Sequence, residues 1–146
     1  MNRFGTKALK TPRVTFIDDD APALRDGMIA ALNRSQAVIE FELDGRILDA
    51  NENFCRALGY GIEEIRGQHH SMFVDPSHRQ SHEYRAFWEK LGRGEYDASQ
   101  YKRIAKGGRE IWIQASYNPI LDTQGRPVRV RSTALAAFEI KVAHTA

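Results

Sequence analysis

Two runs with alternating apolar residues meet at Asp44-Gly45, and this hairpin constrains the fold more than any other feature. The first run covers residues 38–43 and the second covers 46–50. An Asp-Gly pair favours a tight hairpin turn because glycine adopts positive φ without strain. A lone two-stranded hairpin is marginal in water, so these strands require further strands from elsewhere in the chain.

The last third of the sequence supplies those strands. Strands are predicted at residues 96–105, 110–121 and 127–138, separated by turn-forming segments at 106–109 and 122–126. The two early strands and the three late ones must share one sheet. We therefore predict an α+β domain with a five-stranded antiparallel sheet and helices on one face.

Helical patterns fill the rest of the chain. A helix is expected at 21–34, where Leu24, Met28, Ile29 and Leu32 form an apolar stripe. Because this stripe needs a partner surface, it packs on the domain's own sheet or on a second copy of the helix. We predict a homodimer through this helix.

Three more helices are predicted between the two groups of strands. A short one spans 51–60, with Asn51 as its cap and Gly59 as its stop, and another covers 62–65. The third spans 76–91 and carries an apolar stripe, formed by Tyr84, Phe87, Trp88 and Leu91. The space between these helices and the sheet is the expected cavity.

The chain therefore divides into a leader at 1–20, a flanking helix at 21–34, one domain at 35–140 and a tail at 141–146. The leader ends in three aspartates, Asp18 to Asp20. This ending resembles the first strand of response-regulator receiver domains, where such acids bind magnesium. The favoured alternative is that Asp20 caps the flanking helix, with Pro22 in its first turn.

Composition excludes several classes of protein. With 21 Lys and Arg against 19 Asp and Glu, the net charge of +2 argues against a nucleic-acid binder. A single cysteine, Cys55, excludes an intrachain disulfide and a CxxC site. No apolar run reaches the roughly 20 residues of a membrane span, and the N-terminus lacks a secretory signal. We expect a cytoplasmic protein without membrane or nucleic-acid partners.

The order of these elements resembles a PAS domain of the bacterial chemoreceptor type. The motifs that carry the resemblance run from about residue 35 to 130: AVIEF at 37–41, DGRILDANENF at 44–54, LGY at 58–60, GQHHSMFVD at 67–75, EYRAFW at 83–88 and KGGREIWIQASYNPI at 106–120. The resemblance implies a cytoplasmic sensory or dimerisation module of a chemotaxis, redox or oxygen-sensing pathway, not an enzyme.

One departure from the family concerns signal output. PAS domains that pass a signal to a following domain usually end their last strand with an Asp-hydrophobic-Thr motif. Here the stretch is Thr-Ala-Leu-Ala-Ala at 133–137, and neither methyl-accepting helices nor a kinase domain follow. A separate small protein, a fragment, or output through another chain is compatible with this ending.

Haem b is the favoured cofactor by resemblance. Some PAS domains of soluble oxygen-sensing chemoreceptors bind haem b through a histidine on a short helix after an x-Phe-x-x-Asn/Asp-Pro segment. Here Phe73-Val-Asp-Pro-Ser-His78 places His78 in that location. Asp75 is close enough in sequence to orient its ring, and His82 is the competing ligand. The tryptophan that stabilises oxygen in those sensors is absent, with Ala134 near its place.

FAD is the alternative cofactor, and a domain without a tightly held cofactor is the third hypothesis. The aerotaxis branch has a tryptophan soon after a Gly-Glu pair, but here Gly94-Glu95 precedes Tyr96. Trp112 and Asn118 share one strand phase, and Asn118 could bond the edge of a flavin ring. The predicted cofactor-binding residues are His78, His82, Tyr84, Trp88, Trp112 and Asn118, with His78 as the metal ligand.

Three other chemistries are disfavoured. In light-sensing PAS domains a flavin adduct forms on a cysteine of a Gly-x-Asn-Cys-Arg-Phe motif, but His70 takes that place here and Cys55 is expected to be a small core residue. A zinc site from His78 and His82 at i and i+4 lacks good further ligands besides His69 and His70. The HExxH motif of zinc proteases fails at Ala86, so catalysis is not expected.

Overall fold

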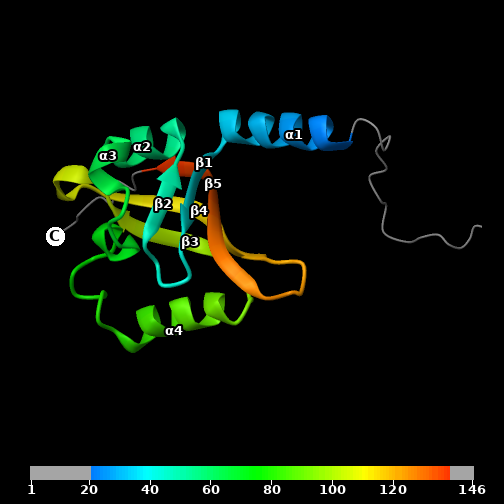
Figure 1. The fold of residues 1–146 in the computed structure, drawn as a ribbon. Coiled ribbons are helices and arrows are strands. Elements are labelled where there is room, and N and C mark those ends of the chain that lie inside the picture. The colour runs from blue at the N-terminus through cyan, green and yellow to red at the C-terminus, as the bar shows by residue number, and fades with distance from the viewer. Residues whose placement is uncertain (1–20, 139–146) are drawn as a thin grey trace, which may run out of the picture. The chain divides into compact units, whose positions relative to one another are not determined.

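The computed structural model describes residues 21–138 of the chain (Figure 1). The predicted leader with its three aspartates and the tail at 141–146 lie outside these residues. Within this range, residues 21–32 and residues 33–138 belong to two separate compact units. In order, the elements are α1 (Ala21–Ser35), β1 (Ala37–Phe41), β2 (Ile47–Ala50), α2 (Glu52–Leu58), α3 (Ile62–Ile65), the 3-10 helix η2 (His70–Phe73), α4 (His82–Gly92), β3 (Asp97–Ile104), the 3-10 turn η3 (Lys106–Gly108), β4 (Glu110–Leu121) and β5 (Pro127–Phe138).

One antiparallel five-stranded sheet contains all the strands of the described residues, in the order β2-β1-β5-β4-β3. The strands that come first and last in the chain, β1 and β5, are neighbours in the sheet, since Ile39 of β1 lies opposite Ser132 of β5. This pairing joins the early hairpin to the three late strands and confirms the predicted α+β architecture. It also gives the hairpin the extra strands that it needs for stability.

The helices after the hairpin bury their apolar side chains against one face of the sheet. The core includes Phe54 and Leu58 from α2, Ile65 from α3 and Leu91 from α4. Along β4, Ile111, Ile113, Ala115 and Tyr117 are buried, whereas the residues between them are more exposed. The period-two pattern in β4 thus decides which side chains face the helices.

Helix α2 begins and ends at the residues that its sequence predicts. The Asn51 side chain accepts a hydrogen bond from Phe54 N, and Gly59 adopts φ 80° at the other end. A side-chain oxygen at the N-cap satisfies one of the free N–H groups of the first turn, and glycine adopts the left-handed conformation without strain.

The prediction of a helix over 76–91 is wrong in its first third. Helix α4 begins only at His82, and residues 76–81 form turns. Asp75 Oδ1 accepts hydrogen bonds from both N and Oγ of Ser77, and Ser81 Oγ accepts from Tyr84 N. These local bonds compete with a continuous helix. The bond from Tyr84 N makes Ser81 the N-cap of α4, so that the helix begins at His82.

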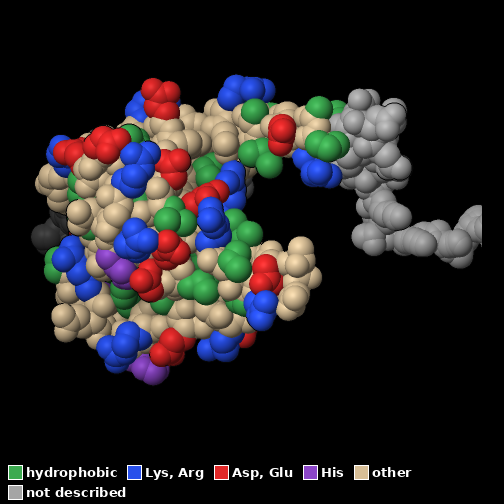
Figure 2. All heavy atoms as spheres, in the orientation of Figure 1, with side chains coloured by type: hydrophobic (Ala, Val, Ile, Leu, Met, Phe, Trp, Pro, Cys, Tyr) green, Lys and Arg blue, Asp and Glu red, His purple; other side chains and the backbone are tan. Residues whose placement is uncertain are grey.

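Helix α1 confirms the predicted flanking helix and carries an exposed apolar stripe. Leu24, Met28, Ile29 and Leu32 are each 42–50% exposed, and Figure 2 shows hydrophobic side chains along this helix. In the part of the chain from 21 to 138, no helix is long and apolar enough to span a bilayer.

Candidate functional site

The space between the helices and the sheet is almost completely filled by side chains. The cavity that remains has a volume of ≈ 10 Å³, which is space for about one water molecule. Its walls are mostly apolar, and three polar side chains reach it, from His70, Arg103 and Tyr117. A drug-sized ligand occupies a pocket of roughly 300 Å³ or more, so this cavity in its present form holds no large ligand.

His70 is the centre of a buried hydrogen-bond network. It is the first residue of η2 and is only 1% exposed. Its Nδ1 lies 2.7 Å from the Tyr84 hydroxyl oxygen on α4, and its Nε2 lies 3.1 Å from the Tyr117 hydroxyl oxygen on β4. Both ring nitrogens are therefore engaged, and the imidazole joins the helical layer to the sheet.

Arg103 extends this network to the neighbouring strand β3. The side chain is 8% exposed, and its Nε and Nη2 donate to the Tyr117 hydroxyl oxygen at 3.3 and 3.0 Å. The guanidinium also stacks on the ring of Tyr101, 4.8 Å from its centroid. No carboxylate of the described residues forms an ion pair with it, although buried arginines are usually paired.

The bonds from Arg103 assign the protons in the network. Because the Tyr117 oxygen accepts from Arg103, its own proton is available for His70 Nε2. The ring proton of His70 is then on Nδ1, and it is donated to Tyr84. Burial lowers the pKa of His70 well below its usual value, with a further contribution from the charge of Arg103. Burial also raises the pKa of Tyr84 to about 12, so both groups are neutral at physiological pH.

The structure brings two of the predicted site residues to the core. Tyr84 is buried and bonds His70, as described above. The ring of Trp88 packs edge-on against Phe41 and His70, with centroid distances of 5.5 and 5.4 Å. Its buried Nε1–H makes no hydrogen bond of normal geometry within the described part of the chain, although Trp88 still acts on the Tyr84 hydroxyl and lowers its pKa against the effect of burial.

The two predicted histidine ligands lie outside the core. His78 is exposed in the turn before α4, where its Nδ1 lies 3.2 Å from Ser81 Oγ. The Asp75 carboxylate bonds Ser77 instead of orienting the His78 ring. His82 is exposed at the start of α4. Between residues 21 and 138, no three His, Cys, Asp or Glu side chains come together as a metal site requires.

Trp112 and Asn118 lie on the opposite face of the sheet from the core. They alternate with the buried Ile111, Ile113 and Tyr117 along β4, and Asn118 Nδ2 donates to Ser116 Oγ at 2.9 Å. The structure therefore does not bring these two residues together with Tyr84 and Trp88.

The residues around the cavity fit neither haem b nor FAD. The proposed iron ligand His78 faces solvent, and both nitrogens of the buried His70 already have partners. The cavity of ≈ 10 Å³ is far smaller than either group. Neither cofactor enters this core unless its side chains rearrange.

Sequence reasoning missed Tyr117 and Arg103 as site residues, although strand alternation contains the signal. Tyr117 shares its phase with the apolar Ile111 and Ile113, which places it on the core face. No periodicity marks His70, because it begins only a single 3-10 turn. Its equivalence to the adduct-forming cysteine of light-sensing PAS domains was the available clue.

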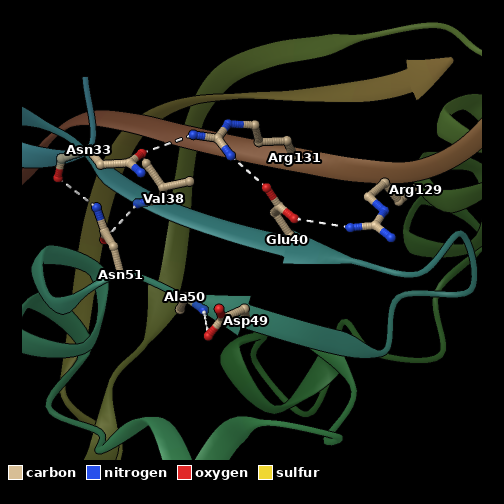
Figure 3. Close-up of polar contacts among 8 residues, drawn as sticks. All are labelled: Asn33, Val38, Glu40, Asp49, Ala50, Asn51, Arg129 and Arg131. Carbon is tan, nitrogen blue, oxygen red and sulfur yellow. Dashed lines mark hydrogen bonds and ion pairs between the residues drawn. The ribbon is translucent and has the colours of Figure 1, made fainter. Parts of the chain in front are cut away.

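A second polar cluster lies where the last residues of α1 meet the sheet (Figure 3). Asn51 Nδ2 donates to the backbone oxygens of Asn33 and Gln36 at 2.9 and 2.7 Å, and Asn51 Oδ1 accepts from Val38 N. Arg131 of β5 bonds the Asn33 side chain at 2.9 Å and pairs with Glu40. These contacts tie Asn33 to Arg131 of β5 and Asn51 to Val38 of β1.

A match to a known protein family identifies the class of protein. The model of the family described as "PAS fold" matches residues 47–134, which is more than half of the chain. The chain therefore belongs to the PAS family, as its motifs predicted.

Its similarity to individual proteins is also clear. The chain is 50% identical over 102 residues to the biofilm dispersion protein BdlA of Pseudomonas aeruginosa, covering 70% of this chain and 24% of BdlA. It is 29% identical over 80 residues to the aerotaxis receptor of Escherichia coli, covering 55% of this chain and 16% of the receptor. The chain thus spans a quarter or less of these curated relatives.

Solved structures agree on the fold. A PAS domain from Colwellia psychrerythraea superposes with a TM-score of 0.67 at 19% identity, covering 80% of this chain and 97% of that one. A light-oxygen-voltage domain studied with a flavin analogue gives a TM-score of 0.62 at 20% identity, covering 77% and 85%. At these identities, the likeness concerns the fold alone.

Proposed function

We propose that this PAS domain is the sensory module of a chemoreceptor-type signalling protein, and that it signals through the hydrogen bonds of its core. The observation that carries the proposal is the position of His70, which bonds α4 through Tyr84 and β4 through Tyr117. A change on one side of the core then reaches the other through a single side chain. A sensory role, not a catalytic one, is supported by the similarity to an aerotaxis receptor and to the biofilm dispersion protein BdlA.

The haem and flavin hypotheses remain the competitors to this proposal. The flavin work on a light-oxygen-voltage domain with the same fold keeps FAD as the alternative. Haem b depends on His78 becoming a ligand, which requires that residues 76–81 move into the core. A filled core whose polar groups bond one another supports a module without either cofactor.

An absorption spectrum with a haem titration separates these hypotheses. We expect the purified protein to show neither a Soret band nor flavin bands at about 370 and 450 nm. Titrated haem should give no saturable Soret shift. A stoichiometric shift that is lost in His78→Ala but kept in His82→Ala would replace the proposal with haem sensing. Flavin bands that remain after gel filtration would replace it with flavin sensing.

We also propose that the protein forms a homodimer through α1. Four large apolar side chains on this helix are half exposed, and such a stripe is typical of a helix that packs on a partner. Sedimentation of the full chain and of Ile29→Lys tests this: the wild type should sediment as a dimer and the variant as a monomer. Arg25→Lys is the matched control on the same helix. If the wild type and Ile29→Lys have the same mass, α1 is not the interface.

A further inference from the structure

An open groove lies outside the core, between the segment that precedes α4 and strand β3. Its volume is ≈ 370 Å³, which is enough for a small organic molecule. Val74, Asp75, Ser77 and His78 line one side, and Tyr101, Lys102 and Arg103 line the other.

Arg103 separates this groove from the core cavity, because its side chain lines both. A guanidinium has five N–H donors. The hydrogen bonds of Arg103 use three of them, two to the Tyr117 oxygen and one from Nη1 to Lys102 O at 3.0 Å. Two donors of a nearly buried cation are thus left for a partner from outside the described residues.

The charges around the groove favour a ligand with a single negative charge. The nearby Lys102 has carboxylates at 3.7 Å on Asp75 and at 3.5 Å on Glu110. Asp97, on the same strand as Arg103, forms an ion pair with Lys90 and accepts a hydrogen bond from the Tyr101 hydroxyl. Among the described residues no carboxylate lies within ion-pair distance of Arg103, and Asp97 acts on it only through the longer-range attraction that helps to lower the Asp97 pKa. A buried charge without a close counter-charge is costly.

We propose that this groove binds a small organic carboxylate, with Arg103 as the residue that receives the carboxylate group. A guanidinium matches the planar geometry of a carboxylate through two parallel N–H···O bonds. The apolar part of the ligand lies against Val74 and the ring of Tyr101. Asp75 stands in the same groove and disfavours a dianion such as phosphate, so a monocarboxylate fits better.

Binding at Arg103 connects this groove to the core network. The bonds from Arg103 to Tyr117 position the hydroxyl that faces His70. A carboxylate that draws the guanidinium toward the groove weakens these bonds and disturbs His70. This inference rests on the proposed sensory function and gives it a class of ligand.

Titration with sodium propionate and sodium benzoate tests the proposal, followed by NMR and by thermal unfolding of the full chain. Sodium chloride at the same ionic strength and inorganic phosphate are the comparison salts. We expect saturable shifts at Lys102 and Arg103 and, at saturation, a shift of the His70 ring signals. Arg103→Gln should weaken binding by about tenfold, since a hydrogen-bonded charge pair is lost. Lys102→Gln should weaken it less, and Lys106→Gln, an ion-paired lysine outside the groove, should not change it.

Several results would overturn the proposal. They are the absence of saturable binding, binding that is unchanged in a folded Arg103→Gln, and tighter binding of phosphate than of either carboxylate. If Arg103→Gln does not fold, unchanged binding in Lys102→Gln overturns it instead. Carboxylate binding without a shift at His70 would refute the connection to the core. None of these results depends on haem or flavin spectra, so failure here leaves the proposed function to its own test.

Discussion

The imidazole of His69 lies directly over Gly45, so closely that a Cβ atom at Gly45 would stand 2.6 Å from His69 Nε2. The same Nε2 lies 2.7 Å from the backbone oxygen of Asp44. Gly45 also adopts φ 97°, a conformation that other residues adopt only with strain. The hairpin turn therefore contacts the residue before η2 at Gly45. A side chain at this position is disfavoured for two independent reasons, the positive φ and the close approach of His69.

Gly45→Ala should therefore lower the free energy of unfolding by about 2–3 kcal/mol, from backbone strain and steric contact together. Gly67→Ala is the matched control, because Gly67 has φ 85° but no atom within 4 Å of the point where its Cβ would stand. Gly67→Ala should lower the free energy of unfolding only by the backbone strain, about 1 kcal/mol. Urea unfolding measures both variants, and equal losses would show that the contact with His69 is unimportant.

Removal of the Tyr117 hydroxyl should lower the free energy of unfolding more than removal of the Tyr84 hydroxyl does. The Tyr117 oxygen accepts from Arg103 and faces His70, whereas the Tyr84 hydroxyl bonds His70. Tyr117→Phe leaves buried donors of a charged group without an acceptor, at a cost of about 2–3 kcal/mol, against about 1 kcal/mol for Tyr84→Phe. The exposed Tyr96 provides the control, Tyr96→Phe. A reversed order in chemical denaturation would contradict the network.

His70 makes the stability of the fold depend on pH. Burial holds its pKa well below the ordinary 6.5, so below that pH the unfolded chain binds a proton that the folded protein does not. The contribution of His70 to stability therefore decreases as the pH falls below about 6.5, by at most about 1.4 kcal/mol per pH unit. In His70→Phe this part of the slope should disappear, while His82→Gln should retain it. Parallel pH profiles for wild type and His70→Phe would reject the prediction.

Asn51→Ala should destabilise the protein by about 2 kcal/mol or more, because one side chain caps α2 and bonds both β1 and the end of α1. The matched control is Asn118→Ala, whose amide bonds the nearby Ser116 hydroxyl on the outer face of the sheet. Thermal unfolding compares the two. A loss of stability in Asn51→Ala that is no larger than that in the control would mean that the second polar cluster, shown in Figure 3, contributes little to stability.

Local sequence signals determined the elements and their order. The Asp44-Gly45 turn, the Asn51 cap and the strand alternation are each set by residues close in the chain, and β4 and β5 have the predicted bounds. The sharing of one sheet by early and late strands also followed from the sequence, since a hairpin alone is not stable. These features depend on backbone propensities and on periodicity, which are readable without a tertiary structure.

Only the tertiary structure decided which polar side chains meet in the core. His70 begins a single 3-10 turn, and its partners Tyr84 and Tyr117 are 14 and 47 residues away in the chain. The sequence instead favoured His78, which local bonds of Asp75, Ser77 and Ser81 keep in an exposed turn. A hydrogen bond between distant residues depends on how the helices pack on the sheet, and that packing leaves no periodic pattern in the sequence.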